Sequence, residues 1–341
     1  MIFKNAELHN VEEIIKSEEH GGYLLSRIPE RVRMRINDNA KKRALCGCGC
    51  EIRFNIKGDK VKITLKRLPG EKASSTGIAE IYYGSFQAPY TLTPQYIGNE
   101  PVTFTIGKPE NIELLERLTK EYHLPFDPNL VRVILPYDWD SCLINIEGEC
   151  EPPNPRQVPK LRYLAYGSSI SHGGSAMRPS GTYTMRIAQL LKADLINMSF
   201  AGSAQMDEAI ADYIAERDDW DFATLELGVN VIKRWTGEEF KKKVDYFISK
   251  IAENNKDKWI FCTDLYTNHA DYEGDKKIKE YREVVKSKVE ELKLPKLVYY
   301  SGREMLTDVT GLSADLLHPS ATGMEEISRN LAKFIAGYLG K

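Results

Sequence analysis

Residues 161–174 read Leu-Arg-Tyr-Leu-Ala-Tyr-Gly-Ser-Ser-Ile-Ser-His-Gly-Gly. The first six residues form a short apolar run, as in a buried strand. The small residues behind it allow a sharp backbone turn that presents a hydroxyl group beside a following helix. This order predicts a strand, a tight turn and a helix start around Ser169.

Similar apolar runs recur downstream, at 195–200, 222–227, 259–263 and 297–300. The stretches between and after them predict helices, at 181–191, 206–215, 238–253, 276–292 and 322–338. Alternation of strands and helices predicts a parallel sheet covered by helices, so the C-terminal half is expected to have an α/β fold.

The N-terminal half has a period of two instead. Apolar side chains alternate with polar ones over 52–56 and again over 61–65, and Lys57–Lys60 separates them as a turn, which predicts a β-hairpin. An antiparallel β-sandwich fits this region best. Further strands are expected at 78–86, 102–106, 131–135 and 143–146, with one short helix at 112–122.

The boundary between the halves is placed by four prolines within Glu149–Lys160, since proline excludes regular helix and favours an extended path. The predicted domains span 1–158, a sandwich that assists or positions substrate, and 159–341, the α/β domain. The 341 residues are enough for two domains.

Composition excludes several classes of partner. The formal net charge is −2, and no block of like charge suggests a nucleic-acid partner. The N-terminus lacks the order of a signal peptide and no apolar run reaches membrane-spanning length, so a cytoplasmic protein without a membrane partner is expected. The six cysteines are expected to stay thiols in that compartment. A homo-oligomer is compatible with the sequence, which leaves the oligomeric state open.

Ligands of parallel α/β sheets bind at the carboxyl ends of the strands, where Ser169 is placed. This serine is a candidate nucleophile. A plain Gly/Ser-rich loop would look the same, and the segment is neither a Gly-x-Ser-x-Gly elbow nor a glycine-rich phosphate-binding motif.

The distant Asp315-Leu316-Leu317-His318-Pro319 segment favours the chemical interpretation. It delivers a base and an orienting carboxylate just before the last helix, in which Pro319 suits the first turn. A carboxylate held against one imidazole nitrogen leaves the other free to accept the serine proton. Taken alone, the pair could equally be a helix cap with surface polarity.

With these residues in view, the sequence resembles the SGNH (GDSL-like) hydrolases, whose four motif blocks occur in order over 167–341. The blocks match Gly167-Ser168-Ser169-Ile170, Gly202 in Asn197–Gly202, Gly228-Val229-Asn230, and Asp315 to His318. The resemblance implies a flavodoxin-like parallel sheet, preceded in the two-domain branch by a jelly-roll-like sandwich.

That resemblance also implies roles for these residues. Ser169 would be the nucleophile, His318 its base and Asp315 the orienting group; the Ser169 and Gly202 N–H groups and the Asn230 side chain would form the oxyanion hole. Preorganised neutral donors suit this task, since each is worth about 3 kcal/mol in the transition state. Read in isolation, Gly202 and Asn230 could each be turn residues.

The sequence departs from the family pattern at Ser168, where the family name expects aspartate, so the hydrogen bonding of this loop must differ. The branch of acyl and carbohydrate esterases that carries a small hydroxyl residue here implies a short acyl ester, chiefly acetate, of a sugar or oligosaccharide, and no cofactor. A lipase, thioesterase or acyltransferase with the same triad is the alternative, and a non-catalytic carbohydrate-binding protein is a second one.

Three further features invite an interpretation. Cys46, Cys48 and Cys50 would place three thiols on one face of a strand, as small buried residues or, with a fourth ligand, as a soft-metal site. His172 could face the pocket or lie on a surface loop. The segment 264–272 leaves the fourth strand and could reach the rim of the active site or form a solvated loop.

Overall fold

The computed structural model describes residues 1–68 and 77–340. The C-terminal half is built on a five-stranded parallel sheet with the order β15-β14-β16-β17-β18, which confirms the flavodoxin-like order expected for this half. The strand bounds are Arg162–Tyr166 (β14), Asp194–Asn197 (β15), Phe222–Glu226 (β16), Trp259–Thr263 (β17) and Leu297–Tyr300 (β18).

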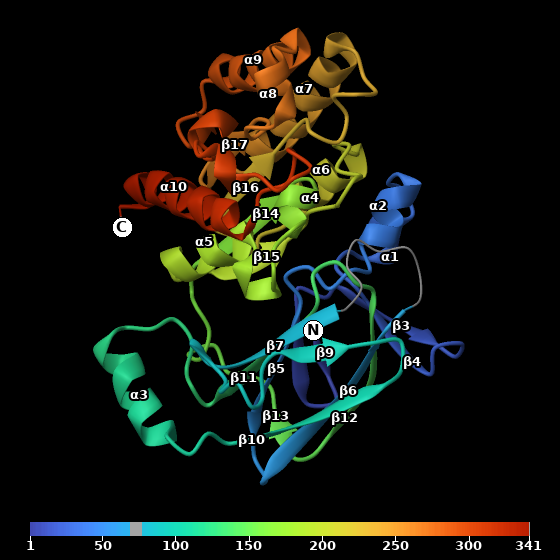
Figure 1. Ribbon diagram of the computed structural model, residues 1–341, viewed down its shortest axis with the longest axis vertical. Helices are drawn as coiled ribbons and strands as arrows, with labels where there is room; N and C mark the ends of the chain where they lie inside the picture. Colours follow the sequence, from blue (N-terminus) through green and yellow to red (C-terminus); the bar gives the residue numbers. More distant parts are fainter. Residues whose placement is uncertain (69–76, 341) are drawn as a thin grey trace.

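Helices cover both faces of this sheet (Figure 1). One face carries α5 (Tyr183–Leu191) and α10 (Ala321–Leu339), and the other carries α6 (Glu208–Glu216), α7 (Gly237–Asn254) and α9 (Lys276–Leu292). All five lie within two residues of the predicted ranges. Short elements complete the half: α4 (Ser169–His172), α8 (His269–Glu273), and the 3-10 turns Pro179–Gly181, Gly302–Glu304 and Val309–Gly311.

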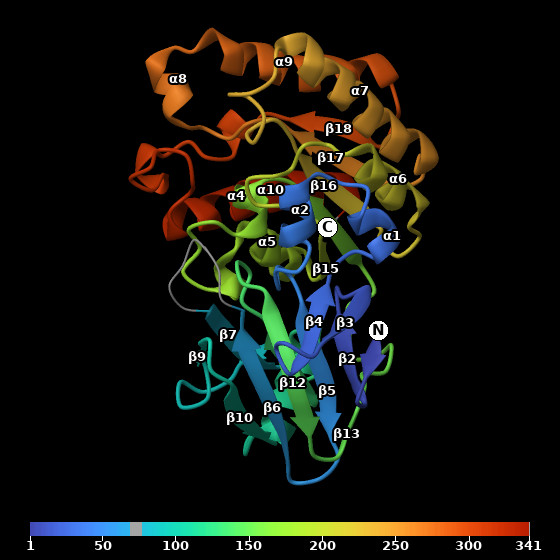
Figure 2. The same cartoon turned by 90° about the vertical axis from the view of Figure 1, so that its right-hand side faces the viewer.

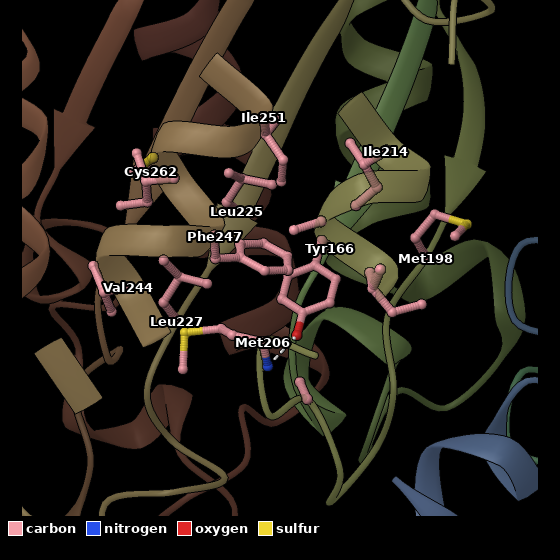
Figure 3. Close-up of a cluster of buried hydrophobic side chains, with 14 of the residues drawn as sticks. Tyr166, Met198, Met206, Ile214, Leu225, Leu227, Val244, Phe247, Ile251 and Cys262 are labelled. Atoms are coloured by element: carbon pink, nitrogen blue, oxygen red, sulfur yellow. Dashed lines mark hydrogen bonds between the residues drawn. The ribbon is translucent and has the colours of Figure 1, made fainter. Parts of the chain in front are cut away.

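Tyr166 illustrates how the sheet is held against the α6–α7 face. Its ring packs on Phe247 of α7 at 4.6 Å between centroids, and Leu225 and Ile214 belong to the same buried cluster (Figure 3). The Tyr166 hydroxyl accepts a hydrogen bond from Met206 N at 2.9 Å. The buried hydroxyl is thereby satisfied, as burial of a polar group requires.

The N-terminal half is a sandwich of two antiparallel sheets, as expected (Figure 2). One sheet contains β1 (Ile2–Phe3), β2 (Ala6–His9), β5 (Glu51–Ile56), β11 (Leu130–Ile134), β7 (Gly77–Tyr83) and β8 (Phe86–Gln87), with β13 (Cys150–Glu151) on β5 and β9 (Gln95–Ile97) on β7. The other contains β10 (Val102–Gly107), β6 (Lys60–Arg67), β12 (Ser141–Glu147), β4 (Gly22–Ser26) and β3 (Glu13–Ser17). Helix α3 spans Ile112–Glu121.

The hairpin predicted over 52–65 is wrong. Both strands exist, but β5 pairs with β2 and β11 in one sheet, whereas β6 pairs with β10 and β12 in the other. The Lys57–Lys60 turn therefore crosses between sheets. Alternation indicates one buried face for each strand, but it carries no information about the pairing partner.

Two short helices, α1 (Glu30–Arg33) and α2 (Asp38–Arg43), were not expected in the N-terminal half. Both lie against the α/β half in both views (Figures 1 and 2), where α1 contacts α6. Apolar side chains from these helices and from the residues that flank them join the buried cluster of the α/β half: Ile28, Val32, Ile36, Ala40 and Ala44. Part of the N-terminal chain thus belongs to the C-terminal core, and a boundary between 158 and 159 stays a prediction.

The two halves also meet through buried ion pairs. Arg53 of β5 donates to both carboxylate oxygens of Asp194 at 2.8 and 2.6 Å, and Glu51 accepts from Arg53 and Arg132. All six residues of β5 are buried, including these polar ones. The polar positions of the alternating pattern are therefore buried, and one of them, Arg53, binds the other half of the protein.

Candidate active site

Ser169 is the first residue of α4, directly behind the carboxyl end of β14. The hydroxyl of Ser168 caps this helix by accepting from Ile170 N at 3.2 Å. A Cβ atom at Gly167 would overlap Ser171 and Glu226, so only glycine permits this close turn. The predicted strand, turn and helix start are all present.

The three residues predicted to form a triad come together from opposite ends of the α/β half. Ser169 Oγ lies 2.8 Å from His318 Nε2, and His318 Nδ1 lies 2.6 Å from Asp315 Oδ2. An Asp on Nδ1 keeps the proton there, so that Nε2 is free to accept from the serine hydroxyl. This is the geometry of a nucleophile, a base and an orienting carboxylate.

Asp315 is held as an anion by its surroundings. Partial burial works to raise its pKa, but hydrogen bonds from His318 outweigh this, together with those from Ser313 and Leu317, and hold the pKa well below its usual range. Asp315 Oδ1 accepts from Ser313 Oγ at 2.7 Å and from the N–H groups of Leu317 and His318 at 2.9 Å each. The carboxylate can therefore neither rotate nor take the imidazole proton over the ordinary pH range.

The predicted oxyanion residues lie on two neighbouring loops. Gly202 has a φ of +68°, a conformation that favours glycine, and Asn230 Oδ1 accepts from Ala204 N at 3.0 Å. The carbonyl end of the Asn230 amide is thus engaged, and its NH₂ end is a donor. Phe200 N donates to Gly167 O at 2.9 Å, which ties the loop of Gly202 to that of Ser169.

Sequence reasoning missed Glu226, the last residue of β16. It is buried beneath the nucleophile loop, where one carboxylate oxygen accepts from Ser168 N at 2.6 Å and from Ser171 Oγ at 3.0 Å. Burial raises its pKa, and its hydrogen bonds with Ser168 and Ser171 oppose the rise. The family name expects an aspartate at position 168; here Glu226, from a neighbouring strand, supplies a carboxylate to this loop. In the sequence, the signal for this residue was a glutamate within the apolar run 222–227, two residues before Gly228.

His172 is neither in the pocket nor on a surface loop. It is 1 % exposed, and its Nδ1 lies 3.0 Å from Ser199 O. Burial first, and then the positive charge of Arg27, lower its pKa to about 3, so the ring is a neutral interior group. Both sequence interpretations are therefore wrong, because α4 packs this side chain inward against the loop after β15.

The cysteine-rich segment is not a strand, and its thiols do not share a face. Cys46 Sγ donates to Asp140 Oδ1 at 3.1 Å, Cys48 Sγ to His172 O at 3.0 Å and Cys50 Sγ to Asn10 O at 3.4 Å. Burial raises the pKa of Cys48 and of Cys50 to about 12. Within residues 1–68 and 77–340, no cluster of three His, Cys, Asp or Glu side chains is arranged to hold a metal ion.

The segment 264–272 lies against the loop of the base and is largely buried. His269 N donates to Leu316 O at 2.7 Å, between Asp315 and His318 in the chain. Asp264, at its start, accepts from Gly302 N at 2.8 Å. The segment thus supports the Asp315–His318 loop from behind and is not a solvated loop.

A cavity of about 690 Å³ lies between the two halves, lined by Tyr82, Phe126, Met185, Arg186 and Ala321 among others. Ser169, Asp315 and His318 are not among its lining residues, so this cavity is separate from the candidate triad. No helix in the described parts of the chain is long and apolar enough to cross a bilayer.

Comparisons with known proteins bear on the fold and the family of the chain. The model of the GDSL-like lipase/acylhydrolase family matches residues 161–336, and the chain belongs to this family, as the four motif blocks predicted. No curated protein matches the sequence.

Solved structures share the whole architecture at low sequence identity. The salicylyl-acyltransferase SsfX3 from a tetracycline biosynthetic pathway is 17 % identical with a TM-score of 0.78, over 98 % of this chain and 95 % of its own. A putative GDSL-like lipase from Bacteroides ovatus is 17 % identical with a TM-score of 0.69, over 98 % of both chains. A family two carbohydrate esterase from Clostridium thermocellum, solved with cellohexaose, is 14 % identical with a TM-score of 0.56, over 85 % and 92 %.

Proposed function

We propose that the protein is a serine esterase in which Ser169 is the nucleophile, His318 the base and Asp315 the orienting group. The observation that carries the proposal is the unbroken contact chain from Ser169 Oγ to His318 Nε2 and from His318 Nδ1 to Asp315 Oδ2. Membership of an acylhydrolase family supports an ester as the substrate.

The reaction has two steps, acylation and deacylation of Ser169. His318 takes the Ser169 proton while the oxygen attacks the ester carbonyl, and the tetrahedral intermediate collapses to an acyl-enzyme as the imidazolium protonates the departing alcohol. Water, deprotonated by His318, then attacks the acyl-enzyme, and the imidazolium returns the proton to the Ser169 oxygen as the acid leaves. The N–H groups of Ser169 and Gly202 and the amide of Asn230 stabilise the negative oxygen in both steps. The reaction needs no cofactor.

The substrate we propose is a short acyl ester, chiefly an acetyl ester, of a sugar or oligosaccharide. Support comes from the fold similarity to the Clostridium thermocellum carbohydrate esterase, which covers 85 % of this chain. The cytoplasmic location expected from the sequence stays a prediction.

Acyl transfer to an alcohol, in place of water, is the second candidate. The fold similarity to the salicylyl-acyltransferase favours it, with a TM-score of 0.78 over nearly the whole of both chains. The two candidates share the acyl-enzyme and differ in the acceptor that reaches it.

The test is a panel of aryl esters of increasing acyl length together with acetylated sugars, assayed with wild type and Ser169→Ala. We expect turnover of acetyl esters that Ser169→Ala loses. A preference for long-chain esters would contradict the acetyl substrate, and activity retained in Ser169→Ala would overturn the serine mechanism. Added alcohols that divert most of the acyl group from water to a new ester would favour the transferase.

A further inference from the structure

The loop that carries Gly202 accepts hydrogen bonds, on both sides of Gly202, from residues of the N-terminal half. Arg27, which precedes α1, binds this loop before Gly202, and Asn37, at the start of α2, binds it after Gly202. Helices α1 and α2 lie beside the α/β half in both overall views (Figures 1 and 2).

Arg27 is fully buried and donates to four backbone carbonyl oxygens. One belongs to the last residue of β15, Asn197 O at 2.7 Å, and one to the loop after it, Ser199 O at 2.8 Å. The other two belong to the N-terminal segment, Cys46 O at 3.1 Å and Arg43 O at 2.8 Å. Because a guanidinium is a rigid planar fork, it fixes the spacing between these two pieces of backbone.

Asn37 holds the other side of the loop. Its Nδ2 donates to Ser203 O at 3.0 Å and to Asp207 Oδ2 at 2.8 Å, while its Oδ1 caps α2 by accepting from Ala40 N at 3.0 Å. The side chain thus joins the start of α2 to the residue directly after Gly202. With Arg27 on Ser199, the Gly202 peptide is bracketed within five residues.

The cysteine–glycine segment allows this close approach. A Cβ atom at Gly49 would lie 2.7 Å from Asn197 Cβ, and Cys48 Sγ reaches His172 O, in the last residue of α4. Small residues at these positions let the N-terminal backbone pack against both the nucleophile helix and the loop after β15. This close packing, and not metal binding, explains why small residues occupy Cys46–Cys50.

We propose that Arg27 and Asn37 are positioning residues that hold the Gly202 N–H group where the oxyanion forms, so that the N-terminal half completes the catalytic centre. This inference rests on the proposed esterase function. An oxyanion donor acts on the transition state far more than on the bound ester, so misplacing it lowers kcat and leaves KM nearly unchanged.

Two substitutions remove the hydrogen bonds from Arg27 and Asn37 to the Gly202 loop with little change of side-chain volume or charge. Arg27→Lys keeps the charge but loses the fork, and Asn37→Ser keeps a helix cap but loses both amide donors. Arg53→Lys is the matched control, because Arg53 is an equally buried arginine that joins the same two halves through Asp194, at the amino end of β15, whereas the Gly202 loop follows its carboxyl end.

The experiment measures kcat and KM for an aryl acetate, the inhibition constant of a trifluoromethyl ketone that forms a tetrahedral adduct, and the melting temperature. For Arg27→Lys and Asn37→Ser we expect kcat to fall about 10- to 100-fold with KM within about threefold, and the ketone to bind correspondingly more weakly. For Arg53→Lys we expect a lower melting temperature with kcat of the folded enzyme unchanged.

Retention of kcat within about threefold in Asn37→Ser and in folded Arg27→Lys would overturn the inference, as would an equal loss of kcat in Arg53→Lys. Should Arg27→Lys not fold, Asn37→Ser decides alone. Failure of the esterase function has a separate signature, since wild type would then be inactive or Ser169→Ala would remain active.

Discussion

Asp315→Asn is the sharpest perturbation of the proposed triad, because the structure dictates how the new amide must orient. Three donors converge on Oδ1 of Asp315: the Ser313 hydroxyl and the N–H groups of Leu317 and His318. An asparagine must keep its carbonyl oxygen there, since its NH₂ group would otherwise face three donors. The NH₂ group is then directed at His318 Nδ1, 2.6 Å from the present Oδ2.

Such an amide reverses the tautomer of His318. Nδ1 must accept a hydrogen bond from the amide, so the proton moves to Nε2, which can no longer take the proton of Ser169. In a Ser-His-Asp triad this change costs about 10⁴-fold in kcat, equivalent to about 5.4 kcal/mol of transition-state stabilisation. The fold should be retained, because the three hydrogen bonds on Oδ1 persist.

The assay is steady-state hydrolysis of an aryl acetate, with urea unfolding as the measure of stability. Asp308→Asn is the control, because Asp308 is an exposed carboxylate in the same connection, and its Oδ1 accepts from the N–H and hydroxyl groups of Thr310, at 2.8 and 2.7 Å. We expect it to keep full activity. A folded Asp315→Asn enzyme within about tenfold of wild-type kcat would refute this account of the base.

Further predictions concern the nucleophile, the base, the buried glutamate and the buried histidine. Ser169→Ala and His318→Ala should each abolish nearly all esterase activity with circular dichroism unchanged, because triad members act as a unit. Glu226→Gln should lower kcat about tenfold, since the loop N–H then faces a neutral acceptor, and unchanged kinetics would show that the carboxylate has no part in positioning the nucleophile. His172, with its pKa lowered to about 3, stays neutral in the fold while the unfolded chain takes up a proton as pH falls below about 6.5. Wild type should therefore lose about 2 to 3 kcal/mol more unfolding free energy than His172→Gln between pH 6.5 and 4.5, and equal losses in urea titrations would contradict the burial argument.

The candidate triad could be found from the sequence because its residues stand where local patterns place them. An apolar run ending in Gly167-Ser168-Ser169 defines a strand exit, and Asp315 with His318 precedes a helix that the sequence also predicts. Strand ends of one parallel sheet meet at one edge, so convergence of these segments followed from topology alone. The structure adds the 2.8 and 2.6 Å contacts.

Pairing and burial could not be predicted in the same way. The hairpin over 52–65 was wrong because the partner of a strand is chosen by long-range packing, which leaves no trace in its own alternation. His172 was misplaced for a similar reason, since a polar residue in a glycine-rich loop looks exposed until its neighbours in space are known.

By itself the sequence determined the α/β order of the C-terminal half, the sandwich character of the N-terminal half and the residues able to form a triad, because periodicity and motif spacing are local properties of the chain. Only the tertiary structure decided that Glu226 supplies the buried carboxylate under the nucleophile loop and that Arg27 and Asn37 bracket Gly202. These contacts join residues 58 to 172 positions apart, and such contacts depend on how whole elements pack.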